Sequence, residues 1–169
     1  GGEARKWYGH LNFVVNWENN GAEIRRNPKS TIRNEKFFYL PGITWSDVGS
    51  NGATFRFFPA NCLRDNRGPA IFTENTNYIL GFLNSKICLM AQKILNPTIC
   101  FQAGSAKTLP FIQNVKYLEI VNKLVDSNIE FSKKDWDSFE TSWDFKRHPL
   151  ITVISQNRAL FDDTTDIDL

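Results

Sequence analysis

Residues 77–97, NYILGFLNSKICLMAQKILNP, mark the point at which the hydrophobic pattern of this 169-residue chain changes from strand-like to helical. Apolar residues recur in this stretch at helical spacing: Ile79, Leu83, Ile87, Met90 or Ala91, and Ile94. The pattern predicts a helix over residues 78–95 with Thr76 or Asn77 as its N-cap. The dipeptide Asn96-Pro97 should end this helix, because the residue before a proline is disfavoured in helical conformation.

The sequence before residue 77 is typical of short strands separated by tight turns. Strands are expected at residues 11–17, 37–40, 43–45, 53–58 and 70–72. Asn19-Asn20-Gly21 is expected to form a turn. Alternation in residues 53–58, ATFRFF, places Phe55 and Phe57 on one face, where they should join Trp45 in the core, and Arg56 on the other face. Polar, basic loops are expected at residues 25–36 and 61–69.

The sequence after residue 97 predicts a short strand and two more helices. Residues 99–101 are the strand candidate, and Gly104 indicates a turn. An amphipathic helix is expected over residues 115–131 with Asn114 as its cap. Ser132 and Asp135 have the spacing of a capping motif for a shorter helix that carries Trp136, Phe139 and Trp143. The chain should therefore have an α/β (α+β) fold, with a mixed sheet first and packed helices after it.

Composition favours a soluble globular protein. Hydrophobic residues make up 41% of the chain and charged residues 22%. No apolar run approaches the roughly 20 residues that cross a bilayer, and the N-terminus lacks the apolar stretch of a signal peptide, so we expect a soluble, cytoplasmic protein. Cys62, Cys88 and Cys100 lack metal-ligand spacing and are expected to be reduced core thiols, with no metal bound.

Catalytic motifs are missing from the sequence. His10 and His148 do not stand near a nucleophile or carboxylate in a known catalytic spacing, and we expect both at the surface. The sequence has no GxGxxG and no GxxxxGK[ST], so no nucleotide or cofactor site is expected in this chain. Asn96-Pro97 is followed by Thr98 and not by a second proline and an aromatic residue, which favours a helix end over the base-gripping motif of amino-group methyltransferases.

Positive charge is concentrated in the first 70 residues. This part carries ten basic and six acidic side chains, a net charge of +4, while the remainder carries −2. A basic face suits a polyanion, because each phosphate that is neutralised releases condensed counterions. We expect backbone contacts to DNA from four residues of the first basic loop: Arg25, Arg26, Lys29 and Arg33. We expect grip or base readout from four others: Arg56, Asn61, Arg64 and Arg67.

Five segments together resemble one known family. They are GGEARKWYGHLNFVVNWENNGAEIR, GITWSDVGSNGATFRFFP, NYILGFLNSKI, ILNPTICFQAGSAKTLPF and, most specifically, DWDSFETSWDF at residues 135–145. In this order they are similar to the C-terminal half of the PglX-like adenine-specific DNA methyltransferases of BREX phage-defence systems. Residues 81–111 alone also resemble the target-recognition domains of restriction-modification specificity subunits and of TaqI-like enzymes.

The resemblance implies a recognition role without catalysis. In that family the S-adenosylmethionine site and the catalytic motifs lie on an N-terminal methyltransferase domain, which this chain lacks, so the chain is expected to be a non-catalytic fragment that needs no cofactor of its own. The implied division is a DNA target-recognition domain at 1–112, a helical connector at 113–150 and a tail at 151–169. The implied partners are double-stranded DNA, the missing methyltransferase domain and other phage-defence subunits, but no membrane.

Two other functions remain open at this stage. The chain is compatible with a separate specificity subunit of a restriction-modification complex, although the predicted helix at 115–131 is short for the coiled-coil spacer of such a subunit. It is also compatible with a protein-interaction module. In that case Trp136, Phe139 and Trp143, which would share one helical stripe, are the residues expected to dock on a partner or on the missing catalytic domain.

Overall fold

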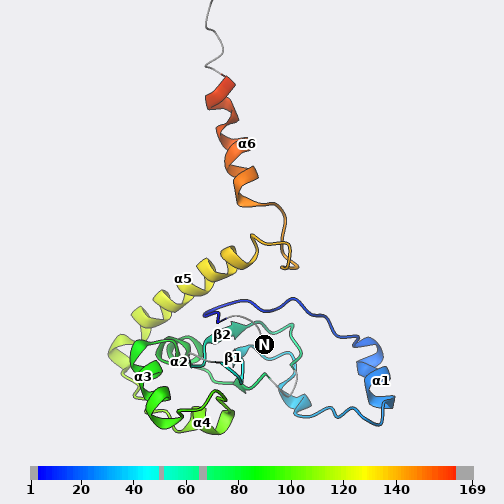
Figure 1. Cartoon of the computed structure of the whole chain (residues 1–169), viewed down its shortest axis with the longest axis vertical. Coiled ribbons are helices and arrows are strands. Elements are labelled where there is room, and N and C mark those ends of the chain that lie inside the picture. The colour runs from blue at the N-terminus through cyan, green and yellow to red at the C-terminus, as the bar shows by residue number, and fades with distance from the viewer. Residues whose placement is uncertain (1–3, 50–51, 65–67, 163–169) are drawn as a thin grey trace, which may run out of the picture.

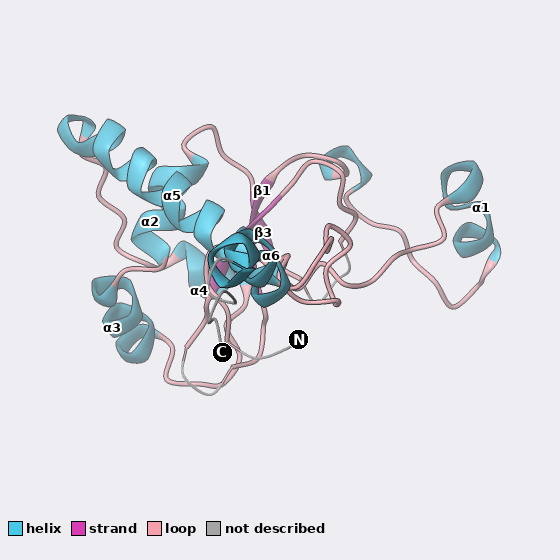
Figure 2. Cartoon of the chain, turned by 90° about the horizontal axis from the view of Figure 1, so that it is seen from above, coloured by secondary structure: helices cyan, strands magenta, loops and turns pink. Residues whose placement is uncertain are grey.

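A computed structural model of the chain describes residues 4–49, 52–64 and 68–162, with side chains described as far as residue 155. It confirms the mixed α/β fold. The sheet has three antiparallel strands, β1 (Gly42–Trp45), β2 (Phe55–Phe58) and β3 (Ala70–Ile71), in the order β2-β1-β3. Helices α2 (Thr76–Leu83), α3 (Lys86–Leu95) and α5 (Leu118–Trp136) lie on one side of this sheet, and α1 (Glu18–Arg26) lies far away on the other side (Figures 1 and 2).

The sheet contains three of the expected strands and is extended by the N-terminal segment. Strands β1, β2 and β3 fall within the segments predicted at 43–45, 53–58 and 70–72, to within one residue. Trp7 forms a parallel bridge with Arg56, donating its N–H to the Phe55 carbonyl and accepting from the Phe57 N–H. Among the described residues the three strands pair only antiparallel, so the parallel pairing of the expected mixed sheet is limited to this single bridge.

The strands predicted at residues 11–17 and 37–40 are wrong. Residues 11–17 are irregular and lead into α1 (Glu18–Arg26), with Phe13 and Val14 exposed to solvent. A strand requires a neighbour, and Trp7 already occupies the edge of β2. The turn expected at Asn19-Asn20-Gly21 is confirmed, because all three residues have left-handed backbone angles. Part of the second segment is instead a 3₁₀ turn, η1 (Glu35–Phe37).

The core lies between one face of the sheet and α2 (Thr76–Leu83). Trp45 and Phe55 are almost fully buried there, as predicted, and Phe57 is partly buried against the same cluster. The indole N–H of Trp45 donates to the carbonyl of buried Phe101, at 2.6 Å. Residues 99–101 form only a short bridge with the segment after β1, through Val48 and Cys100. This bridge fixes the segment that leads into α4 (Ala103–Lys107) beside the sheet.

The single helix predicted over 78–95 is two helices, α2 and α3 (Lys86–Leu95). The break falls at Asn84-Ser85 because both side chains bind backbone groups. Ser85 caps α3 by accepting from the Cys88 N–H. Asn84 is buried and binds β2, accepting from the Phe55 N–H at 3.2 Å and donating to the Phe55 carbonyl at 2.9 Å. The end of the second helix at Asn96 is as predicted.

Helix α5 (Leu118–Trp136) covers α2 and holds the N-terminal segment. It follows the 3₁₀ turn η2 (Val115–Tyr117), which Asn114 caps as predicted by accepting from the Lys116 N–H. Helix α5 continues through Ser132, so the separate helix predicted to begin there is wrong. The Ser132 hydroxyl instead bonds the carbonyls of Lys6 and Tyr8, and Arg5 pairs with Asp135 at 2.5 Å. These contacts attach the start of the chain to the end of α5.

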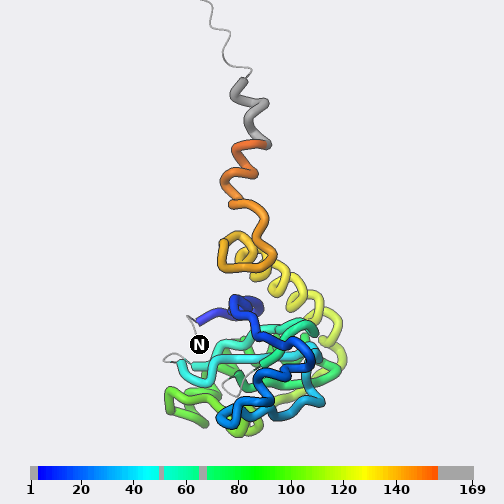
Figure 3. Tube along the Cα trace, turned by 90° about the vertical axis from the view of Figure 1, so that its right-hand side faces the viewer, coloured from blue at the N-terminus to red at the C-terminus, as the bar shows by residue number. Residues whose placement is uncertain are grey.

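The remaining elements differ from expectation at three places. Gly104 lies inside a short helix, α4 (Ala103–Lys107), and not in a turn. Helix α6 (Pro149–Asp162) spans most of the segment predicted to be a tail, and it projects away from the rest of the chain (Figures 1 and 3). Cys88 is buried as expected, but Cys100 is exposed, because its segment runs along the surface.

Among the described residues, none of the helices is long and apolar enough to span a membrane.

Candidate nucleic-acid interface

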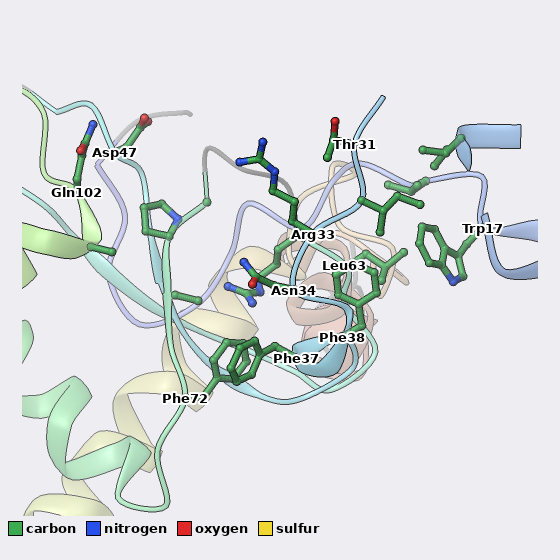
Figure 4. A pocket seen from close by; sticks show the side chains of 18 of the residues that line it. Trp17, Thr31, Arg33, Asn34, Phe37, Phe38, Asp47, Leu63, Phe72 and Gln102 are labelled. Atoms are coloured by element: carbon green, nitrogen blue, oxygen red, sulfur yellow. The ribbon is translucent and has the colours of Figure 1, made fainter. Parts of the chain in front are cut away.

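An open cleft of about 1270 Å³ lies beside the sheet, between segments that are far apart in the sequence. One wall comes from residues 29–38, which follow α1, and another from residues 63–64 and 68–72, which include β3. Asp47 and Gln102 stand at the opposite lip (Figure 4). Three of the predicted DNA-contacting residues, Lys29, Arg33 and Arg64, line this cleft together.

Aromatic rings inside the cleft hold Arg64. The rings of Phe37 and Phe72 stack with their centroids 4.7 Å apart. The Arg64 guanidinium lies 4.6 Å from the ring centroids of both Phe72 and Phe58. Two cation–π contacts restrict the arginine rotamers while leaving the N–H groups free to bind an acceptor. Partial burial lowers the pKa of Arg64 below its ordinary value. Arg64 is therefore a cation that is already ordered in the absence of any ligand.

The cleft cations differ from Arg25 in their partners. Arg25 donates two hydrogen bonds to the Glu35 carboxylate, at 3.1 and 2.6 Å, and this pairing raises the pKa of Arg25 and lowers that of Glu35. Within the described part of the chain, Lys29, Arg33 and Arg64 form no ion pair. Arg26 is exposed but does not line the cleft. An incoming anion would meet Lys29, Arg33 and Arg64 without first breaking an internal salt bridge.

Arg56 is not on the surface, contrary to the strand-alternation argument. Only 5% of it is exposed, because the N-terminal segment covers that face of β2. Its guanidinium donates to the Arg5 carbonyl at 3.4 Å and to the Ser46 hydroxyl at 3.3 Å, and its Nε has no partner. Burial, together with the nearby charge of Arg5, lowers the pKa of Arg56 to about 10. In this conformation Arg56 does not reach a ligand.

Asn61, another of the predicted contacts, does not line the cleft. Asn61 is exposed beyond the end of β2, and its side-chain oxygen faces the Cys62 thiol at 3.6 Å. Arg67 falls outside the residues that the structure describes. Of the seven proposed residues that the structure describes, it therefore brings three together in the cleft.

The aromatic stripe predicted for docking does not form. Trp136 ends α5 and packs against Arg5, whose guanidinium lies 5.1 Å from its ring centroid. Phe139 and Trp143 lie in turns beyond the helix and are 54% and 69% exposed. The chain turns back because Asp137 is tied to Ser142 and to Lys133, which also pairs with Asp144. These three aromatic residues therefore do not share a helix face.

A different apolar face, on α3, is exposed to solvent. On α3, Ile87, Met90 and Ile94 are 75%, 66% and 72% exposed, although their spacing is that of a buried helix face. The opposite face of α3 supplies Cys88 and Gln92 to the core, and Gln92 accepts from the Ala53 N–H. Periodicity identified the apolar face correctly, but it could not show that no described part of the chain covers it.

Comparison with known proteins identifies relatives for most of the chain, while no protein-family profile matches it. The adenine-specific methyltransferase BrxX of Escherichia coli O9:H4 (strain HS) is 37% identical over 156 residues, which are 89% of this chain and 12% of that protein. The adenine-specific methyltransferase PglX of Lacticaseibacillus casei (strain Zhang) is 35% identical over 167 residues, which are 93% of this chain and 14% of that protein. The resemblance to PglX-like methyltransferases is confirmed, and the chain spans only 12–14% of the length of these relatives.

Proposed function

We propose that this chain is the DNA target-recognition part of an adenine-specific DNA methyltransferase of the BREX phage-defence type, acting on double-stranded DNA in the cytoplasm. Two relatives named as adenine-specific methyltransferases support the enzyme class. The matched segment is a small part of each, which supports a division in which S-adenosylmethionine binding and methyl transfer belong to another part of a longer polypeptide.

The observation that carries the proposal is the convergence of Lys29, Arg33 and Arg64 on one cleft. Lys29 and Arg33 are exposed on a loop, where cations suit phosphates. Arg64 lies against two rings, so its guanidinium fork loses little rotamer freedom on binding and suits the O6 and N7 acceptors of guanine. Arg25 and Arg56 drop out of the proposed contacts, since one is paired with Glu35 and the other is buried. Arg26 and Asn61 remain candidates for contacts at the edge of the site.

The exposed face of α3 favours a second, compatible role in assembly. Ile87, Met90 and Ile94 form an apolar helix face that is costly to leave in water. The relatives carry most of their length outside the matched segment, so we assign this face to packing against another part of the same polypeptide. The alternative of a separate specificity subunit is disfavoured because α5, at 19 residues, is short for a coiled-coil spacer.

The test is salt-dependent DNA binding by the longer polypeptide with Lys29→Gln and Arg33→Gln combined. We expect weaker binding to every duplex and a salt slope that is shallower by about two units, roughly one per lost phosphate contact. The matched control is Lys93→Gln with Lys107→Gln, which removes the same charge from exposed lysines outside the cleft. Unchanged affinity and slope in the cleft variant would remove the cleft from the DNA site.

The substitution Arg64→Met tests whether Arg64 recognises a base or only attracts the DNA phosphates. It removes the guanidinium and keeps an apolar side chain of similar length against Phe58 and Phe72. We expect loss of preference at one base pair, at a cost of about 1–3 kcal/mol. Loss of affinity for all sequences alike would assign Arg64 to a phosphate instead.

A further inference from the structure

The cleft has one lip whose chemistry differs from the rest. Lys29, Arg33 and Arg64 supply positive charge, but Asp47 and Gln102 form the lip opposite Arg33 (Figure 4). Asp47 is partly exposed, and in the portion of the chain that the structure describes its carboxylate makes no ion pair with these or other cations. An unpaired carboxylate beside a phosphate site repels the ligand, so its position requires a separate explanation.

Backbone pairing holds this lip rigidly. The N–H of Phe101 donates to the Asp47 carbonyl at 2.7 Å, and the N–H of Gly49 donates to the Ile99 carbonyl at 2.9 Å. The Phe101 carbonyl in turn accepts from the buried indole of Trp45. Asp47 and Gln102 thus extend from the bridge between the end of β1 and the start of α4. These bonds fix the backbone of the lip, so both side chains start from defined positions, as a recognition surface requires.

The chemistry of the carboxylate selects its ligand. An ionised carboxylate only accepts hydrogen bonds, and the phosphates and deoxyribose of duplex DNA offer it no N–H donor. In the major groove the donors are the exocyclic amino groups, N4 of cytosine and N6 of adenine. Aspartate pairs most directly with cytosine N4, whereas an amide such as Gln102 matches the donor and acceptor of adenine.

We propose that Asp47 reads a base by accepting a hydrogen bond from the N4 amino group of cytosine, so that the Asp47–Gln102 lip specifies sequence while the Lys29–Arg33 wall holds the backbone. This assignment rests on the proposed function of the cleft as a DNA site. It adds a readout residue that the basic-loop pattern does not contain.

The experiment is selection from a duplex library with a randomised core, using the longer polypeptide and its Asp47→Ala and Asp47→Asn variants. For Asp47→Ala we expect an approximately tenfold loss of enrichment at one base pair that the parent reads as C·G, within the usual cost of one mismatched pair. Affinity for scrambled duplexes should rise slightly in the same variant, because a negative charge near phosphates is gone. Asp47→Asn should move the preference at that pair from cytosine toward adenine.

Controls separate the outcomes. Glu140→Ala removes an exposed carboxylate outside the cleft and should leave the selected sequence unchanged. The near-isosteric Asp47→Asn keeps the test valid if the alanine variant fails to fold. Unchanged base preference in Asp47→Ala, or equally tighter binding to all duplexes, refutes the assignment and leaves Asp47 as a repelling surface charge. If the Asp47 variants give this result but the combined Lys29 and Arg33 variant still weakens DNA binding, only the Asp47 assignment is refuted. If the combined variant binds DNA as the parent does, the assignment of the cleft as a DNA site is refuted.

Discussion

Replacing Asn84 tests how the two-helix unit is joined to the sheet. The Phe55 N–H and C=O point away from β1, since the carbonyl accepts from Trp7 on that edge. The Asn84 amide pairs with both groups as a neighbouring strand would, at 3.2 and 2.9 Å. In Asn84→Ala the Phe55 carbonyl keeps Trp7 as a donor, but the buried Phe55 N–H loses its side-chain acceptor.

The expected cost follows from these partners. An unsatisfied buried donor costs about 1–3 kcal/mol, and the loss of a second hydrogen bond adds about 1 kcal/mol. We therefore expect Asn84→Ala to lower the free energy of unfolding by about 2–4 kcal/mol. Urea denaturation followed through the fluorescence of buried Trp45 and the other tryptophans measures it.

The pH dependence of stability in Asn84→Asp tests the same pair of hydrogen bonds. An ionised aspartate accepts from the Phe55 N–H but places an oxygen against the Phe55 carbonyl, whereas a protonated one donates to it. Burial and this contact should raise the folded-state pKa of the new carboxyl above its unfolded value of about 3.9. The variant should therefore match the parent best below about pH 3.9 and lose stability relative to it as pH rises through the folded pKa. A deficit in Asn84→Ala below about 0.5 kcal/mol, or a deficit in Asn84→Asp that does not change with pH, refutes this account.

Two further substitutions test packing and burial. A Cβ at Gly81 would lie 3.0 Å from Val125 and 3.1 Å from Val121, so Gly81→Val should separate α2 from α5 and lower the free energy of unfolding by about 1–3 kcal/mol. In the control Gly104→Val the new Cβ meets no atom within 4 Å, and stability should not change. Equal effects of the two substitutions in thermal or urea unfolding would contradict the contact between α2 and α5. Burial lowers the pKa of Arg56 from its ordinary value to about 10, which corresponds to a penalty of at most about 3 kcal/mol that two long hydrogen bonds only partly offset. Arg56→Met should therefore raise the free energy of unfolding by about 1 kcal/mol, and a clear loss of stability would show that the buried guanidinium stabilises the fold.

The sequence by itself determined the elements whose formation depends on local pattern. Alternation of apolar residues predicted the three sheet strands, and helical periodicity predicted that helices begin near Thr76. The proline after Asn96 predicted the end of α3, and the side-chain chemistry of Asn114 identified it as a cap. The family resemblance was also contained in the sequence, because it depends on the order of motifs and not on their contacts. Lys29, Arg33 and Arg64 could be nominated as cations, but nothing in the sequence showed that they face one cleft.

Only the tertiary structure decided which side chains are covered and which remain free. Arg56 has the alternation of a solvent-facing residue, yet the distant N-terminal segment pairs over it. Ile87, Met90 and Ile94 have the periodicity of core, yet no described part of the chain packs over them. Ser132 has the spacing of a helix cap, yet it lies inside α5, near its end, and bonds residues 6 and 8. In each case a contact between residues far apart in sequence, or its absence, outweighs a local preference of about 1 kcal/mol or less.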